Sequence, residues 1–472
     1  MSAASDIPAR LDRLPWSRWH WRVVAALGVA WVLDGLEVTL VGSIGGVLER
    51  SDTLALDATQ VGWTGSLYVA GAVLGALLFG RLTDRLGRKK LFMATLAVYM
   101  AATLATAAST DFLFLAVCRF VTGLGIGGEY AAINSAIDEL IPARVRGRVN
   151  LIINASFWIG AALGAGLSLV ILDERALGPA IGWRACFLLG AVLAVGILLV
   201  RRHVPESPRW LLMHGKSEQA EQTVAAIEAE IAAERGPLPA PQSRPDAPRA
   251  GSGMLDLRQI AAVLLHRYRA RSVMVALMMV AQAFVYNAIF FTYALVLTRF
   301  YQVPDNRVAL YIFPFALGNV LGPLLLGHLF DSVGRRRMIA ATYLLSGIGL
   351  AATAWAFSAG VLSAVTLALC WSAVFFVASA AASSAYLTAS EVFPLQMRAM
   401  AISIFYAVGT GAGGFAAPAL LGWLIASGDR QAVAAGYALG AVLALLAGLC
   451  ALRLAVDAER RGLEEVAELG PR

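Results

Sequence analysis

The stretch that decides the fold reads Gly80-Arg-Leu-Thr-Asp84-Arg-Leu-Gly87-Arg-Lys-Lys90, and each end of it borders a long apolar segment. It recurs as Gly327-His-Leu-Phe-Asp331-Ser-Val-Gly334-Arg-Arg-Arg337. A second motif repeats at a similar offset: Glu139-Leu-Ile-Pro142 followed by Arg146, and Glu391-Val-Phe-Pro394 followed by Arg398. Two motifs that share one offset of about 250 residues indicate an internal duplication, and duplicated membrane halves are typical of secondary transporters.

Composition places most of the chain in lipid. Hydrophobic residues make up 59% of the 472 residues, only 15% are charged, and the mean hydropathy is +0.70. Soluble domains are less apolar, and a helix needs roughly 20 apolar residues to cross a bilayer. The pattern predicts an all-α membrane protein of twelve transmembrane helices in two pseudo-symmetric six-helix bundles. We expect the helices near residues 21–48, 60–80, 90–110, 112–136, 149–172, 183–202, 272–298, 308–330, 337–357, 359–388, 399–425 and 431–453.

The basic residues indicate how the chain is oriented. Most Lys and Arg fall in loops on one side if both termini are cytoplasmic, which obeys the positive-inside rule. The net charge of +7 is thereby explained by cytoplasm and anionic lipid headgroups, without nucleic acid. Residues 1–20 have no apolar run, so we expect no cleavable signal peptide there. We expect a monomeric, multi-pass protein of the cell membrane that is surrounded by lipid and has both termini in the cytoplasm.

The bundles divide the chain into predicted parts. Residues 1–20 and 454–472 are cytoplasmic ends, 21–202 and 272–453 are the two bundles, and 203–271 is a cytoplasmic central loop. The loop begins with an Ala/Glu/Gln-rich stretch, Lys216–Arg235, that favours a helix. Residues 235–253 are rich in Pro, Gly and Ser and predict a flexible linker. The four cysteines fall inside apolar segments without metal-ligand spacing, so we expect neither a metal nor a cofactor.

Three motifs together resemble the major facilitator superfamily, in its sugar-porter-like and metabolite:proton-symporter branches. They are the two Gly-x-x-x-Asp-x-x-Gly-Arg loops, Pro205-Glu-Ser-Pro-Arg-Trp-Leu211, and Arg119-Phe-Val-Thr-Gly123-Leu-Gly-Ile-Gly-Gly-Glu129. The resemblance covers nearly the whole chain. It implies two six-helix bundles with a central site that opens alternately to each side.

The loop motifs make physical sense as a gate. Asp84 ends one segment, where it can cap a helix N-terminus or pair with Arg across the bundle interface. Gly87 permits a tight turn and Gly80 a close helix approach. The alternative is that these charges only fix topology, but Arg alone would then suffice. The predicted gating residues are Gly80, Asp84, Arg85, Gly87, Arg88, Glu139, Arg146, Glu206, Arg209, Asp331, Gly334, Arg335, Glu391 and Arg398.

Charges inside the membrane give a sharper signal. Asp34 and Glu37 are three residues apart and share one helix face. Because an ionised group at mid-bilayer costs roughly 2.5–3.5 kcal/mol, two acids on one face indicate a wet cavity rather than lipid. Arg119 is the expected countercharge: at about 1.5 Å per residue it lies about 10 Å from the outer end of its helix, and Glu37 about 16 Å from its own.

The resemblance gives these residues roles. In sugar-porter-like proteins an acid at the position of Glu37 is the proton site and pairs with an Arg at the position of Arg119. Asp34 adds the Asp-Gly-x-Asp-like pattern of organic-acid symporters. Breaking the pair would let the carboxylate take a proton, because the Arg that favours its charged form is removed. A static structural ion pair is the alternative.

Polar and aromatic residues at mid-depth form the candidate solute site. Gln282 and Asn287 match the spacing of a sugar-porter motif, but Ala281 replaces its first Gln, and Ala161 replaces a sugar-binding Gln. The missing amides favour a small organic acid over a hexose. The predicted solute contacts are Asn154, Trp158, Gln282, Tyr286, Asn287, Tyr386 and Tyr406; Asn319, Glu129 and Asn134 are further polar candidates, and helix packing is the alternative for each aromatic residue.

Other motifs do not indicate an enzyme. The glycines between Gly123 and Gly128 imitate a dinucleotide fingerprint, but no strand precedes them, and small-residue helix packing explains them. The sequence predicts a proton-coupled symporter of a small polar metabolite, with an organic acid favoured. The open alternatives are a sugar or polyol symporter, an uncoupled facilitator or exchanger, a drug exporter, and a non-transporting receptor.

Overall fold

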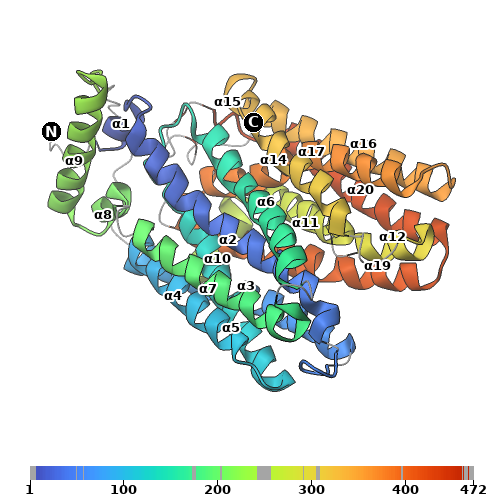
Figure 1. The fold of residues 1–472 in the computed structure, drawn as a ribbon. Coiled ribbons are helices and arrows are strands. Elements are labelled where there is room, and N and C mark those ends of the chain that lie inside the picture. Colours follow the sequence, from blue (N-terminus) through green and yellow to red (C-terminus); the bar gives the residue numbers. More distant parts are fainter. Residues whose placement is uncertain are drawn as a thin grey trace.

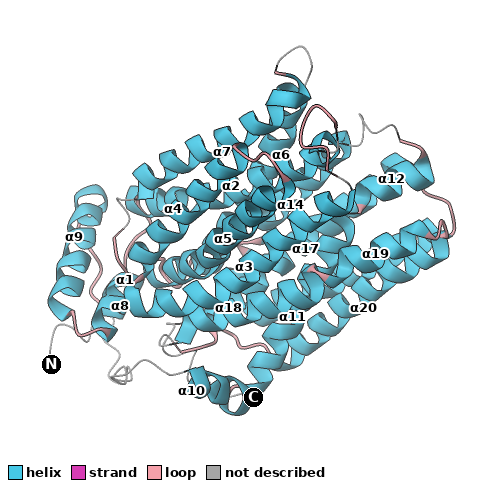
Figure 2. Ribbon diagram, turned by 90° about the horizontal axis from the view of Figure 1, so that it is seen from below, coloured by secondary structure: helices cyan, strands magenta, loops and turns pink. Residues whose placement is uncertain are grey.

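The fold was analysed in a computed structural model. It describes residues 7–48, 50–56, 58–172, 177–201, 205–241, 257–290, 292–303, 309–394, 397–459, 461 and 466. Most of the predicted linker 235–253 and most of the C-terminal tail lie outside these residues, and so does the side chain of Asp84. Within the described residues the regular secondary structure is helical (Figures 1 and 2).

The described helices confirm the predicted class. Ten helices are long and apolar enough to cross a membrane, and two shorter apolar stretches, Ile181–Gly196 and Met400–Gly414, bring the described set to twelve. The first six are α2 (Arg18–Leu48), α3 (Ala58–Leu86), α4 (Arg88–Ala107), α5 (Phe112–Leu140), α6 (Arg146–Ile171) and α7 (Gly178–Arg201). The chain is therefore a multi-pass integral membrane protein.

The second half contains interruptions that the hydropathy pattern did not predict. The expected seventh segment, 272–298, is two helices, α11 (Arg269–Phe290) and α12 (Tyr293–Tyr301). The eleventh, 399–425, is α18 (Arg398–Gly409) and α19 (Ala416–Ala426), joined by the π-helical turn η5 (Thr410–Gly414). The others are α14 (Ile312–Leu326) with α15 (Leu329–Ser332), α16 (Arg335–Ser358), α17 (Ala364–Glu391) and α20 (Arg430–Leu454). Irregular backbone inside a membrane protein is tolerated where protein covers it.

Two groups of helices pack side by side (Figure 1). In the first half α2 packs on α6 and α3 on α5; in the second α14 packs on α17 and α16 on α20. The halves meet where α6 packs on α14 and α3 on α18. The helices α17 and α5 add to this interface, because α17 also packs on α6 and α18 also packs on α5.

Small residues let α3 and α5 approach closely. A Cβ atom added at Gly123 would lie 2.0 Å from the Tyr68 carbonyl oxygen, and one at Gly127 would lie 2.0 Å from the Ala72 carbonyl oxygen. Such distances are sterically impossible, so only glycine fits. The glycine run of α5 is thus a packing surface, as its position within an apolar segment predicted.

Two short chain segments pack on the bundle end that carries Gly87 and Gly334, here called the motif end. They are α1 (Ile7–Asp12), and α8 (Pro208–Met213) with α9 (Ser217–Arg235) (Figure 1). Arg10 pairs with Glu228 at 2.6 Å, and Arg13 pairs with the same carboxylate at 2.5 Å. Burial alone would raise the pKa of Glu228, but the hydrogen bonds from both arginines hold it below its usual value.

A short π-helical turn precedes the second half. The helix α10 (Leu257–Ala262) continues into η2 (Val263–Arg267) and leads directly to α11. The 3₁₀ turn η3 (Ala309–Tyr311) similarly leads into α14.

Candidate functional site

The buried charges predicted at mid-membrane meet inside the first half. Arg119 on α5 contacts Glu37 on α2, with Nη1 2.5 Å from Oε1. Both residues are only 2% exposed. Thr103 on α4 donates a hydrogen bond of 3.4 Å to the other carboxylate oxygen, Oε2. The carboxylate is therefore held from two neighbouring helices.

Asp34, one turn before Glu37, is bound from a different helix. The hydroxyl of Tyr68 on α3 donates to Asp34 Oδ1 at 3.0 Å. The ring of Tyr68 lies under Arg119, with Cζ 4.6 Å from the ring centroid, and Phe187 flanks the guanidinium at 5.8 Å. The two acids are thus linked through one tyrosine and one arginine.

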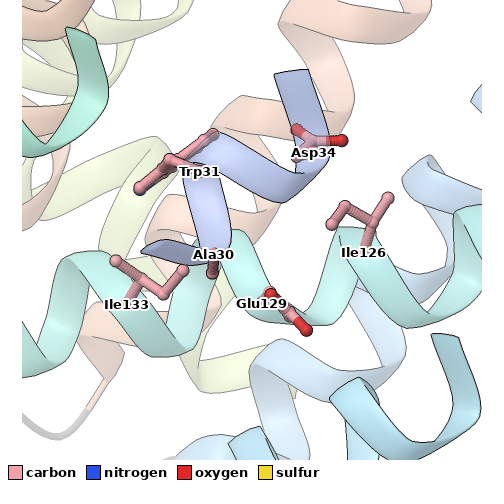
Figure 3. A pocket seen from close by; sticks show the side chains of 6 residues that line it. All are labelled: Ala30, Trp31, Asp34, Ile126, Glu129 and Ile133. Carbon is pink, nitrogen blue, oxygen red and sulfur yellow. The ribbon is translucent and has the colours of Figure 1, made fainter. Parts of the chain in front are cut away.

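A small pocket adjoins Asp34. Ala30, Trp31 and Asp34 on α2 face Ile126, Glu129 and Ile133 on α5 (Figure 3). Glu129 is 2% exposed. The pocket brings a third carboxyl group to the same part of the first half.

An aromatic cluster joins the halves near the centre. Trp158 on α6 lies 5.9 Å from Tyr286 and 5.4 Å from Phe290, both on α11, measured between ring centroids. Phe375 on α17 lies 4.8 Å from Tyr286. The Tyr286 hydroxyl donates to Asn319 Oδ1 on α14 at 2.5 Å. This arrangement places Trp158 and Tyr286 together, as a shared site would require.

The amide side chains predicted to contact the solute do not gather in one cluster. Asn154 and Asn287 each donate to the backbone carbonyl one turn earlier, at 2.8 and 2.6 Å. Tyr386 and Tyr406 are neighbours, with ring centroids 6.4 Å apart. Tyr386 also lies beside Gln282 and within electrostatic reach of Asp34. The side chain of Asn134 lies outside the described residues.

The first loop motif forms a buried ion pair at the motif end. Arg88 Nη2 lies 3.0 Å from Glu139 Oε1, and the Glu206 carboxylate accepts from the backbone N–H of Arg88 at 2.9 Å. Gly87 between the helices has φ of 104°, and a Cβ there would lie 2.4 Å from Glu206 Oε2. A glycine is therefore required both by the backbone angle and by the approaching carboxylate.

The second loop motif repeats this arrangement. Arg335 is bound by Glu391 at 3.0 Å and by Asp331 at 2.8 Å. Glu459 accepts from the Arg335 backbone N–H at 3.1 Å, as Glu206 does in the first half, and Gly334 has φ of 118°. The duplication read from the sequence is thus also a duplication of charge geometry.

Two polar contacts cross between the halves at the motif end. Asp331 Oδ2 accepts from the backbone N–H of Arg148, in the first turn of α6, at 2.8 Å. Arg146 Nη1 lies 3.9 Å from Glu391 Oε1. A carboxylate at a helix N-terminus is favoured by the exposed N–H groups and the helix dipole. These contacts hold the motif ends of the halves together.

Other predicted gating residues occupy different positions. Arg398 donates to the Phe393 carbonyl oxygen at 3.5 Å, and Arg209 reaches Asp12 of α1 at 3.4 Å. Gly80 is buried and Arg85 is exposed. The predicted role of Asp84 concerns a side chain outside the described part of the structure.

We expect Asp331→Asn to loosen the motif end, because the amide keeps the shape of the side chain but not its charge. A loss of about 1–2 kcal/mol would change a two-state ratio roughly 5–30-fold. Labelling of a reporter cysteine placed at Asn150, which is buried in α6, measures opening from that end. Ser332→Ala, at the exposed neighbouring position, is the control, and equal labelling of both variants would contradict the gate.

Several site residues were not identified from the sequence. Tyr68, Phe290 and Phe375 are aromatic residues in apolar helices, where nothing in the pattern distinguishes them from packing residues. Glu459 had a usable signal. It follows Glu206 at an offset of 253 (459 − 206), close to that of the loop motifs.

Curated relatives match most of the chain. The niacin transporter NiaP of Acinetobacter baylyi is 28% identical over 426 residues, covering 90% of this chain and 91% of that protein. The 4-hydroxybenzoate transporter PcaK of Pseudomonas putida is 27% identical and covers 73% of each chain. These relatives are transporters and not enzymes.

Solved structures and a family model identify the fold. The proton:xylose symporter XylE bound to 6-bromo-6-deoxy-D-glucose matches with a TM-score of 0.77 at 20% identity, over 94% of this chain and 98% of that one. A partially occluded, inward-open conformation of the Escherichia coli xylose transporter matches with 0.66, over 92% and 97%. The family model described as "Sugar (and other) transporter" matches residues 43–469. The chain therefore belongs to the sugar (and other) transporter family of the major facilitator superfamily, and it has the twelve-helix fold of that superfamily.

Proposed function

We propose that this transporter is a proton-coupled symporter of a small aromatic carboxylate. The observation that carries the proposal is the buried Glu37–Arg119 pair beside Asp34. Niacin and 4-hydroxybenzoate, named for two relatives, each combine a ring with a carboxylate. Arg119 of this pair can bind the carboxylate of such a solute, and the aromatic cluster can pack against its ring.

Coupling would arise from the cost of leaving a buried charge unpaired. Removing one partner from a buried ion pair costs about 3–5 kcal/mol, far more than losing an exposed pair. An anion that approaches Arg119 therefore binds more readily when Glu37 is protonated and neutral. Deprotonation of Glu37 would then restore the ion pair and release the anion. One guanidinium shared between solute and Glu37 makes each event depend on the other.

The aromatic cluster supports the proposal that the solute contains an aromatic ring. Trp158 comes from the first half of the chain, whereas Tyr286 and Phe375 come from the second. Rings prefer offset or edge-to-face contacts worth about 0.5–1.5 kcal/mol each. A bound aromatic ring would pack between aromatic side chains that come from different halves of the protein. The affinity for the solute would thus depend on how far the two halves have closed.

The orientation and the surroundings follow from charge. We propose that the motif end faces the cytoplasm, because basic residues concentrate there. The contacts of Asp331 and Arg146 would then close the cytoplasmic side. The proton gradient supplies the energy, and the two bundles 21–202 and 272–453 move as units around the central site.

We expect Glu37→Gln to abolish proton-driven accumulation while keeping solute counterflow, because the amide resembles the protonated acid. The measurement is uptake of labelled benzoate into vesicles, with and without a pH gradient, together with benzoate affinity between about pH 6 and 9. Benzoate stays ionised in this range, since carboxyl groups titrate near pH 4. Wild-type affinity should increase as the pH falls, and the variant should show no such change.

Neutral solutes and a matched variant provide the controls. Glu230→Gln removes a carboxylate of α9 that pairs with the exposed side chain of Arg22, and it should leave coupling unchanged. Tight binding of a neutral polyol, without any response to benzoate, would instead favour a sugar or polyol symporter. Benzoate uptake that persists in an uncoupler without loss of accumulation would exclude proton coupling.

A further inference from the structure

We propose that Tyr68 is a positioning residue that couples the protonation of Asp34 to the Glu37–Arg119 pair. The inference rests on the proposed function, since it concerns how the proton-carrying groups communicate. Neither the loop motifs nor the spacing of charges points to Tyr68. Its significance comes only from the groups that its two ends contact.

The two ends of one side chain contact two different charges. The hydroxyl donates to Asp34 Oδ1 at 3.0 Å, and the ring face lies 4.6 Å from Arg119 Cζ. Arg119 in turn holds Glu37 at 2.5 Å. The hydroxyl contact is a charge-assisted hydrogen bond when Asp34 is ionised, and the ring contact is a cation–π interaction. A change at Asp34 thus reaches Arg119 through a rigid ring.

The backbone of Tyr68 is held tightly enough to transmit such a change. Its carbonyl oxygen occupies the space that a Cβ at Gly123 would fill, at 2.0 Å. Gly123 is one helical turn after Arg119 on α5, so the same close approach sets the height of the ring relative to the guanidinium. With the backbone fixed, the position of the ring depends on side-chain contacts alone.

Other titratable groups also face this site, and each belongs to a packed neighbour. Asp34, Glu37, Arg119 and Tyr99 all act electrostatically on Tyr68. Tyr99 on α4 also lies near Glu129 of the pocket in Figure 3. From the second half, Tyr386 lies within reach of Asp34. Groups from both halves of the transporter therefore lie around Asp34.

This geometry links the two acids through Tyr68 and Arg119. While Asp34 is ionised, the hydroxyl holds the ring beneath Arg119, and Arg119 stays on Glu37. When Asp34 takes a proton, the bond loses its charge assistance and the ring is free to turn. The support beneath Arg119 then weakens, and Glu37 is released for protonation. Interacting sites of this kind show transitions that belong to the pair and not to one residue.

The test compares Tyr68→Phe with the wild type, because phenylalanine keeps the ring and removes only the hydroxyl. Without the hydroxyl, the ring is not held beneath Arg119 even while Asp34 is ionised, so Arg119 is less firmly supported on Glu37. We expect the pH dependence of benzoate affinity to move up by about one pH unit. Tyr68→Leu also removes the ring, so it should in addition reduce pH-driven accumulation more than counterflow.

Tyr343→Phe is the matched control. Its hydroxyl donates to the Met278 carbonyl oxygen at 2.9 Å in the second half, and the residue is 2% exposed. Like Tyr68→Phe, this variant loses one buried hydrogen bond of a tyrosine, but that bond is not made to Asp34 or Glu37. We expect its pH dependence to match that of the wild type.

A measurement without ligand separates this inference from the proposed function. The melting temperature of the empty protein is compared between Tyr68→Phe and wild type across pH. The difference should be large at high pH, where Asp34 is ionised, and should shrink as the pH falls. A folded Tyr68→Phe protein with the wild-type pH dependence in both measurements overturns the role of Tyr68. If the wild-type protein neither binds benzoate nor changes its affinity with pH, the proposed function is wrong. The comparison of melting temperatures would still test the contact between Tyr68 and Asp34.

Discussion

Replacing Arg119 by alanine should stop solute accumulation and also destabilise the protein strongly. The substitution leaves Glu37 buried and unpaired, which costs about 3–5 kcal/mol. The Tyr68 ring loses its cation at the same time. The measurements are pH-driven benzoate uptake in vesicles and the melting temperature of the purified protein at neutral pH.

A double variant separates stability from mechanism. Arg119→Ala with Glu37→Gln removes both charges, so the folded protein should regain much of the lost stability without regaining accumulation. The interaction between the two substitutions is measured by a double-mutant cycle, and contacting residues typically deviate from additivity by about 0.5–3 kcal/mol. Additive effects would show that the pair does not interact, and normal accumulation by Arg119→Ala would exclude the shared guanidinium.

Replacing Gly147 by valine should force the motif ends apart. A Cβ at Gly147 would lie 2.3 Å from Nη1 of Arg335, across the interface between the halves. Arg335 cannot move aside cheaply, because Glu391 and Asp331 hold it and it is 1% exposed. Overpacking costs about 1–3 kcal/mol, which would favour the open motif end roughly 5–150-fold.

The control lies on the same helix. A Cβ at Gly166 of α6 would meet no atom within 4 Å, so Gly166→Ala changes helix propensity without touching the second half. Labelling of a cysteine at Asn150 should rise in Gly147→Val and stay at the wild-type level in Gly166→Ala. The native cysteines are replaced first. Equal labelling of the two variants would show that the motif ends do not close through this contact.

The two effects concern opposite parts of one cycle. Arg119 and Glu37 lie within the first half, whereas Gly147 and Arg335 lie at the junction between halves. Losing Arg119 removes the driving reaction but leaves the junction intact. Blocking the junction leaves the ion pair intact but displaces the conformational equilibrium. Cysteine labelling at Asn150 should therefore rise in Gly147→Val but not in the Arg119 double variant.

Some of the site could be predicted because charges are rare in membrane segments. Glu37 and Arg119 were paired from depth alone, since a helix rises by about 1.5 Å per residue. The same reasoning gave no partner for Asp34, because its partner is a tyrosine. The polar and aromatic solute site expected at mid-depth is only partly assembled: Tyr286 lies beside Trp158, but Asn287 donates to the Ala283 carbonyl oxygen of its own helix.

The sequence pattern also did not predict the interruptions between α11 and α12 and between α18 and α19. Both segments are mainly apolar, and hydropathy reports the solvent around a segment and not the continuity of its hydrogen bonds. The glycines in Thr410–Gly414 are compatible with a regular helix as well as with a π-helical turn. Packing against α11 decides between them.

The sequence by itself determined the twelve-helix membrane fold and the duplication of its loop motifs. These features are local: lipid requires apolar segments of a fixed length, and a positive φ requires glycine at Gly87 and Gly334. Only the tertiary structure decided that Tyr68 joins Asp34 to Arg119 and that Asp331 caps α6. The physical reason is that lipid-facing and protein-facing sides of a membrane helix are both apolar. Hydrophobic periodicity therefore leaves the rotation of each helix open until small residues set which faces meet.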